Sequence, residues 1–300
     1  MTAVANQIDF KPLRNASQMA SLIAEVTGEP VKRVLERLEI EHRHPGRTVA
    51  QDFARHGVPL YTDGPEMSAF YGSTDAFLYE LAVWNRNLLK MSMRHFVRRH
   101  LARRQRPLDV LCIGDGLGFD SLDFARQGHR VTYFELPGRG EQFARSLFEK
   151  SGVQITIQTD PAQISLNAFD AVTCFDVLEH VADPPIMVRE CASYLRDGGH
   201  FYVSAPFYMV HPRYPTHLRS NRRFSGRLRL FERAGLELVG GRFTWYPLAF
   251  CKPRQDVVER DRWAIFMVRL SAGSQKLGRW MTWPFLPVHW LRRLCNRRFR

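Results

Sequence analysis

The most informative segment of the chain reads Asp109-Val110-Leu111-Cys112-Ile113-Gly114-Asp115-Gly116-Leu117-Gly118-Phe119-Asp120. Its apolar first part predicts a β-strand over residues 110–113, and apolar residues return at helical spacing after the glycines. Glycine at three alternate positions permits a sharp turn in which the backbone lies directly against a ligand. The segment therefore predicts a strand, a glycine-rich loop and a helix, as in nucleotide-binding turns.

A second apolar run, residues 131–134, predicts a strand that ends at Glu135, about 20 residues after the glycines. A carboxylate at this place meets the ribose hydroxyls of a bound nucleoside. A dinucleotide loop needs its third glycine one position later, where this chain has Phe119. We therefore expect a nucleoside cofactor that is not a dinucleotide. The alternative is an ordinary strand-to-helix turn with a solvated acid.

Further strands and helices follow along the chain. Strands are predicted at 153–158, 171–175 and 200–205, and helices at 184–195 and 224–234. Residues 236–245 and 263–270 also have strand character. We expect these two segments to form the antiparallel pair that closes the sheet, joined by a charged excursion over residues 247–261.

The ordered motifs resemble those of class I S-adenosylmethionine-dependent methyltransferases. They are the G-x-G-x-G loop, Phe169-Asp170, Leu178-Glu179-His180-Val181 and Gly198-Gly199. Within that superfamily the chain looks most like the ubiquinone-biosynthesis O-methyltransferases and related small-molecule enzymes, over about residues 108–245. The resemblance implies an α/β fold with a Rossmann-like, doubly wound, seven-stranded sheet and an N-terminal helical extension.

The cofactor implied by the resemblance is S-adenosylmethionine. The residues expected to bind it are Gly114, Asp115, Gly116 and Gly118 through the backbone, Glu135 at the ribose, Asp160 near the adenine, and Phe175 and Asp176 after the fourth strand. The chain departs from the family at Cys112, where relatives carry an acid that orients the cofactor. Asp115 is the candidate substitute.

A hydroxyl acceptor must lose a proton, and three histidines are candidates to accept it. His180 stands in the motif after the fourth strand, and His211 and His217 stand in the loop expected to face the substrate. The alternatives are a structural His180 and idle loop histidines. No metal site is expected, because Pro206-Phe207-Tyr208 occupies the place where a metal-assisted catechol mechanism would need acidic or amide ligands.

The chain divides into three predicted regions. Residues 1–104 form a helical cap with lid candidates Tyr71, Tyr79 and Trp84, residues 105–270 form the methyltransferase domain, and residues 271–300 form a basic, tryptophan-rich tail. The tail suits either packing against the N-terminal helices, which we favour slightly, or peripheral contact with a membrane.

Composition limits the functional classes. The 300 residues carry a net charge of +13, which attracts nucleic acid, anionic lipid or acidic substrates, or reflects only a basic surface. No apolar run can span a bilayer, the N-terminus lacks a signal-peptide layout, and the five scattered cysteines suit reduced thiols in a cytoplasmic protein.

The leading hypothesis is methyl transfer to a small, hydrophobic or lipid-linked acceptor, most plausibly on oxygen. The alternatives are an RNA or DNA methyltransferase and a non-catalytic binding protein with the same fold.

Overall fold

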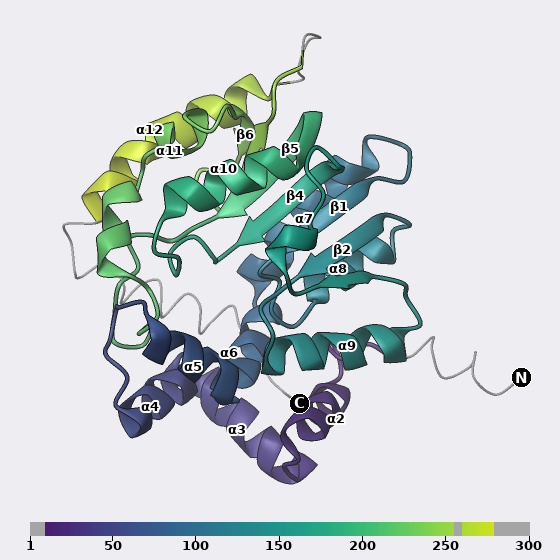
Figure 1. The fold of residues 1–300 in the computed structure, drawn as a ribbon, viewed down its shortest axis with the longest axis vertical. Coiled ribbons are helices and arrows are strands. Elements are labelled where there is room, and N and C mark those ends of the chain that lie inside the picture. The colour runs from purple at the N-terminus through teal and green to yellow at the C-terminus, as the bar shows by residue number, and fades with distance from the viewer. Residues whose placement is uncertain (1–9, 255–259, 279–300) are drawn as a thin grey trace, which may run out of the picture.

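A seven-stranded sheet forms the centre of the computed structural model, which describes residues 10–254 and 260–278 (Figure 1). The strands are β1 (Asp109–Ile113), β2 (Arg130–Phe134), β3 (Thr156–Gln158), β4 (Phe169–Phe175), β5 (Leu195–Ser204), β6 (Glu237–Gly241) and β7 (Leu248–Cys251). Their order is β3-β2-β1-β4-β5-β7-β6, and β7 alone runs antiparallel to its neighbours. The predicted α/β, Rossmann-like sheet is confirmed.

Helices cover both faces of the sheet, which is why its central strands are almost continuously apolar and buried. One face packs against α10 (Pro184–Tyr194), α11 (Arg229–Glu232) and α12 (Arg262–Gly278). The other face packs against α7 (Leu88–Ala102) and α8 (Phe119–Ala125). The remaining helical elements of this half are α9 (Arg139–Ser151) and the 3₁₀ turns η1 (Pro161–Gln163) and η2 (Arg219–Phe224).

The N-terminal extension is helical, as predicted. Before α7 it contains α2 (Ala16–Thr27), α3 (Val31–Arg43), α4 (Arg47–His56), α5 (Pro65–Ser73) and α6 (Ala76–Asn85). Asn15 caps α2 by accepting a hydrogen bond from Gln18 N, and Gly28 ends the helix in the left-handed conformation. The α2, α3 and α6 side chains share one apolar cluster with α9. The predicted boundary near residue 104 therefore crosses a continuous core, and the three-region division stays a prediction.

The predicted strand at residues 263–270 is wrong, because this segment lies within helix α12. Its exposed side chains Trp263, Phe266 and Leu270 recur three and four residues apart, whereas Val268 is buried. That spacing is helical, and a short apolar run alone does not separate helix from strand. The last strand among the described residues is β7, whose four residues are all buried and which lies inside the predicted charged excursion.

Several other predicted elements exist with different bounds. The helix expected at 224–234 is reduced to the single turn of α11, which follows the 3₁₀ turn η2. Strand β3 is shorter than predicted, and β5 begins earlier, at Leu195. Four cysteines, Cys112, Cys174, Cys191 and Cys251, are buried free thiols. Cys295 and most of the tryptophan-rich tail lie outside the described residues.

None of the helices within residues 10–254 and 260–278 is both long enough and apolar enough to cross a membrane.

Candidate functional site

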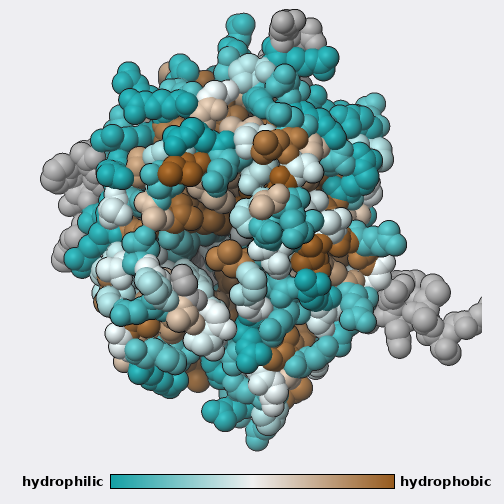
Figure 2. All heavy atoms as spheres, in the orientation of Figure 1, coloured by the Kyte–Doolittle hydropathy of each residue, from teal (hydrophilic) through white to brown (hydrophobic). Residues whose placement is uncertain are grey.

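A cavity of about 370 Å³ lies between the N-terminal helices and the carboxyl ends of β1, β2 and β4. Tyr71, Phe77 and Trp84 line it from the helical side, and the loops after the three strands line it from the other. In the space-filling view a hollow bordered by apolar atoms opens between these parts (Figure 2). The cavity therefore lies where ligands bind in open parallel sheets, outside the carboxyl ends of the strands.

The glycine loop forms the floor of the cavity. Gly114 and Gly116 line it, and both have a positive φ, of 65° and 56°. A Cβ added at Gly114 would collide with the side chain of Val177 in the loop after β4. Glycine at this position thus allows two loops to approach closely and leaves the space beside them open.

Glu135 lies at the end of β2, and its carboxylate faces the same loop. One oxygen accepts a hydrogen bond of 2.8 Å from Gly116 N, and the other accepts one of 2.9 Å from Leu136 N. Burial raises the pKa of Glu135. The acid expected to bind ribose therefore lines the cavity and contacts the glycine loop directly.

Asp115 lies beneath the loop and is absent from the cavity lining. Its two oxygens accept hydrogen bonds from the backbone N–H groups of Asp120 and Ser121, at 3.1 and 2.7 Å. The side chain thus caps the start of α8, and burial together with the Asp120 charge raises its pKa. These contacts give Asp115 a role in shaping the loop, and its contact with the cofactor stays a prediction.

Two buried, positively charged side chains on α7, Lys90 and Arg94, pair with Asp120 at the start of α8. Lys90 Nζ lies 2.8 Å from one Asp120 oxygen, and Arg94 Nε lies 2.6 Å from the other. Burial disfavours the charged form of Asp120, but the two cations outweigh it and hold the pKa of Asp120 below its usual value. An ion cluster therefore joins α7 to the helix that follows the glycine loop.

Asp176 follows β4 directly and lines the cavity with a φ of 58°. Its carboxylate accepts a hydrogen bond of 2.9 Å from Trp84 Nε1 on α6 and one of 3.0 Å from Ser204 Oγ at the end of β5. The side chain expected to flank the cofactor thus also connects the cap to the sheet.

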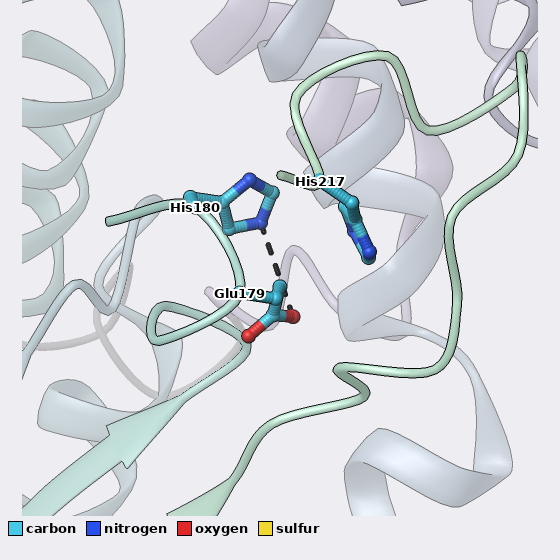
Figure 3. A group of neighbouring side chains, drawn as sticks. All are labelled: Glu179, His180 and His217. Atoms are coloured by element: carbon cyan, nitrogen blue, oxygen red, sulfur yellow. Dashed lines mark ion pairs between the residues drawn. The ribbon is translucent and has the colours of Figure 1, made fainter. Parts of the chain in front are cut away.

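His180 and His217 lie together at the cavity, although they are far apart along the chain. His180 also contacts Thr216, which lies 36 positions further along the chain, directly before His217. Their ring centroids are 4.7 Å apart, with an interplanar angle of 83°. The carboxylate of Glu179, 1% exposed, lies 3.9 Å from His180 Nε2 (Figure 3). The loop after β4 carries Glu179 and His180, and the loop after β5 carries His217.

The protonation of His180 follows from its neighbours. Its Nδ1 lies 3.3 Å from the carbonyl oxygen of Thr216, which can only accept a hydrogen bond. Nδ1 therefore carries the hydrogen, and Nε2 presents a lone pair on the Glu179 side. Burial lowers the pKa of His180 to about 4, so the ring is neutral at pH 7.

Several predicted site residues lie away from the cavity lining. His211 is half-buried on the loop, where its Nδ1 accepts a hydrogen bond from Arg213 N. Asp160 is exposed and caps η1 through Ala162 N, and Phe175 packs in the core at 5% exposure. At Gly118 an added Cβ would meet the Phe148 ring, so this glycine serves packing.

His180 and His217 are also candidate metal ligands, together with Glu179. Glu179, His180 and His217 each offer a ligand atom, and these atoms lie within 4.8 Å of one another. Carboxylate and imidazole ligands suit transition metals such as Zn²⁺. The expectation that the protein needs no metal therefore remains a prediction to be tested.

The sequence reasoning missed some of these residues. Glu179 was part of a quoted motif without a role of its own, and Lys90 and Arg94 were not singled out. Of the lid candidates, Tyr71 and Trp84 line the cavity. Tyr79 is fully buried, with the Arg37 guanidinium 3.8 Å from its ring centroid. The available sign of an internal ion cluster was the spacing of Lys90 and Arg94, four residues apart on one face of a predicted helix together with Met93 and Val97.

Comparison with known proteins independently supports a methyltransferase domain in this chain. A family described as "Methyltransferase domain" matches residues 111–203, from β1 to β5. The ubiquinone biosynthesis O-methyltransferase of Xanthomonas axonopodis pv. citri is 40% identical over 99 residues, 32% of this chain and 41% of that protein. The enzyme of the same description from Serratia proteamaculans is 37% identical over 100 residues, with the same coverage. The chain thus spans about two fifths of the length of these curated relatives.

Among solved structures, the chain is similar to Burkholderia thailandensis 1,6-didemethyltoxoflavin-N1-methyltransferase with bound 1,6-didemethyltoxoflavin and S-adenosylhomocysteine. The identity is 18% and the TM-score is 0.45, over 69% of this chain and 88% of the other.

Proposed function

The chain contains a class I S-adenosylmethionine-dependent methyltransferase domain, and from this premise we propose that it methylates an oxygen atom of a small, hydrophobic acceptor. The observation that carries the proposal is the meeting of the glycine loop, Glu135 and the His180–His217 pair in one cavity. Adenosine recognition and proton removal are thereby available at the same place.

The residues present fit the cofactor. Gly116 and the Glu135 carboxylate form a cradle, and a Cβ added at Gly116 would meet the side chain of Leu81, so this position requires glycine. S-adenosylmethionine supplies an activated methyl group, so the protein must position the acceptor and exclude water. We assign adenosine and ribose binding to Gly114, Gly116, Glu135 and Asp176, with Trp84 closing the site from the cap.

His180 is the proposed base. Its Nε2 lone pair accepts the acceptor's hydroxyl proton, and the Glu179 carboxylate 3.9 Å away then stabilises the imidazolium that forms. The Thr216 carbonyl fixes the ring in the tautomer that this step requires. His217 packs against the ring and limits its rotation.

The acceptor is proposed to be hydrophobic or lipid-linked. The side chains that surround His180 and His217 include Tyr71, Phe77, Val181 and Tyr214, which suit an apolar ring or chain. The curated relatives are named for ubiquinone biosynthesis, which is consistent with such an acceptor.

Exposed Trp263, Phe266 and Leu270 on α12 lead into the C-terminal tail and favour its peripheral contact with a membrane.

Two measurements test the proposal. Calorimetry with S-adenosylhomocysteine measures cofactor binding, and release of S-adenosylhomocysteine from S-adenosylmethionine measures turnover with separate lipid and aqueous cell extracts. We expect binding, and turnover with the lipid extract that falls at least about a hundredfold in His180→Gln, the low end of general-base effects. Absence of cofactor binding contradicts the enzymatic proposal, and turnover with the aqueous extract alone contradicts the acceptor class.

A further inference from the structure

A second large cavity lies at the opposite end of the sheet. It has a volume of about 820 Å³ and is lined at the amino ends of β1, β4 and β5 and at the end of antiparallel β7. We name it the arginine cleft, after the arginines that line it: Arg103, Arg104, Arg106, Arg196, Arg254 and Arg260. The proposed methyl-transfer site uses none of these residues.

The cleft has an excess of positive charge. Among the described residues, which leave out 255–259, three carboxylates, Asp170, Asp197 and Asp261, line it together with the six arginines. Arg106 pairs with Asp170 at 2.8 Å, Arg196 pairs with Asp109 at 2.8 Å and with Asp170 at 3.3 Å, and Arg260 pairs with Glu237. Among the described residues no ion pair involves Arg103 or Arg104, so the excess charge lies with these two. The lining side chains therefore leave a field that attracts anions.

Arg104 has an unusual partner within the cleft. Its Nη2 lies 3.1 Å from Nδ1 of His200, which is half-buried on β5. Burial and the nearby Arg104 charge lower the pKa of His200 to about 4, so the imidazole is neutral and does not compensate the arginine. His200 stacks on Tyr202, with ring centroids 6.1 Å apart, which fixes its orientation.

Arg103 and Arg104 stand next to each other just after α7, and both are exposed. An arginine that donates to a neutral ring nitrogen keeps its charge and further N–H donors for a ligand. Guanidinium groups bind phosphate oxygens in bidentate geometry. We propose that the arginine cleft binds a phosphate ester or diphosphate group, with Arg103 and Arg104 as its principal contacts.

The proposal is independent of the methyl-transfer site, and inorganic pyrophosphate is the probe that tests it. Calorimetry on the full chain compares wild type, Arg103→Ala/Arg104→Ala and the control Arg189→Ala/Arg233→Ala. The control removes two exposed arginines that do not line the cleft. We expect pyrophosphate binding to weaken at least tenfold in the cleft variant and less than twofold in the control. Arg104→Gln provides a milder variant, and unchanged S-adenosylhomocysteine affinity shows that the fold is intact.

Absence of pyrophosphate binding in wild type overturns the proposal. Equal weakening in both double variants also overturns it, because binding would then depend only on the net charge of the protein. A single-stranded RNA oligomer that displaces pyrophosphate and binds far more tightly also overturns the assignment to a small group. Flotation with phosphatidylcholine vesicles, with and without phosphatidate, identifies the source of the phosphate. Flotation that depends on phosphatidate and on Arg103 and Arg104 indicates a lipid headgroup. Pyrophosphate binding without flotation indicates a free metabolite.

Discussion

Trp84 Nε1 donates a hydrogen bond of 2.9 Å to Asp176 Oδ2, and this contact joins helix α6 of the cap to the loop after β4. Asp176 also accepts a hydrogen bond from Ser204, so a single carboxylate connects helix α6, the loop after β4 and the end of β5 at the cavity. The Asp176 carboxylate therefore links the cap to the sheet beside the cofactor cradle.

We predict that Trp84→Phe weakens S-adenosylhomocysteine binding by about tenfold or more. The variant keeps an aromatic ring but removes a hydrogen bond to a charged group, which contributes about 1.5–3 kcal/mol. Calorimetry measures the affinity, and Trp263→Phe on the exposed face of α12 is the matched control. Equal affinities of Trp84→Phe and wild type would show that the cap contact does not support the cofactor site.

Gly114→Ala should abolish measurable cofactor binding, because the new Cβ collides with Val177 at a positive φ. Gly128→Ala is the control, since Gly128 also has a positive φ but has no atom within 4 Å of an added Cβ. The backbone strain, about 1 kcal/mol, is common to both variants. Thermal unfolding followed by circular dichroism separates loss of the loop geometry from loss of the fold. Similar cofactor affinity in the two variants contradicts the proposed cradle.

Asp120→Asn should destabilise the protein by about 3–5 kcal/mol, because it leaves Lys90 and Arg94 buried without their carboxylate. Urea unfolding measures the free energy of unfolding. Asp63→Asn, at an exposed position, should change it by less than about 0.5 kcal/mol. A loss below about 1 kcal/mol for Asp120→Asn would show that the ion cluster is not a structural support.

His180 should make stability depend on pH. Its pKa is about 4 in the folded protein, whereas unfolded histidine titrates near pH 6.5. Between these values the unfolded chain binds more protons, so this contribution to stability is complete above about pH 6.5 and is lost as pH falls toward 4. Urea unfolding at pH 7 and pH 5 should show a smaller difference for His180→Gln than for wild type. His200 has a similarly lowered pKa and will keep part of the dependence in the variant.

Turnover should not require a divalent metal, because the loop after β5 begins Pro206-Phe207-Tyr208 and supplies no carboxylate or amide ligand there. Treatment with EDTA, followed by removal of the chelator, should therefore leave the rate unchanged. A rate that falls and recovers with added Zn²⁺ or Mg²⁺ would instead assign the Glu179–His180–His217 group as a metal site. His217→Asn should then weaken metal binding, whereas His211→Asn should not.

The sequence was sufficient to predict the strands β1 to β5 and the positions of Gly114, Gly116 and Glu135, because local patterns specify them. A glycine that follows an apolar strand, and an acid at the end of the next strand, can be recognised from their order along the chain alone. Trp84 could not be distinguished from ordinary helix packing, because its partner Asp176 is 92 residues away. Residues 263–270 were misassigned because helical and strand periods are not separable in a short apolar run.

Strand β7 lies between β5 and the edge strand β6, so the last of the described strands in chain order inserts between two earlier strands rather than extending the edge of the sheet. Until Cys251 has left the ribosome, the outer side of β5 has no partner, and β6 has no neighbour to hold it. Nascent chains that stop before this strand would expose an open, apolar sheet edge that can pair with other chains. Completion of the sheet therefore requires synthesis of β7, and the unfinished sheet is exposed to aggregation before that point.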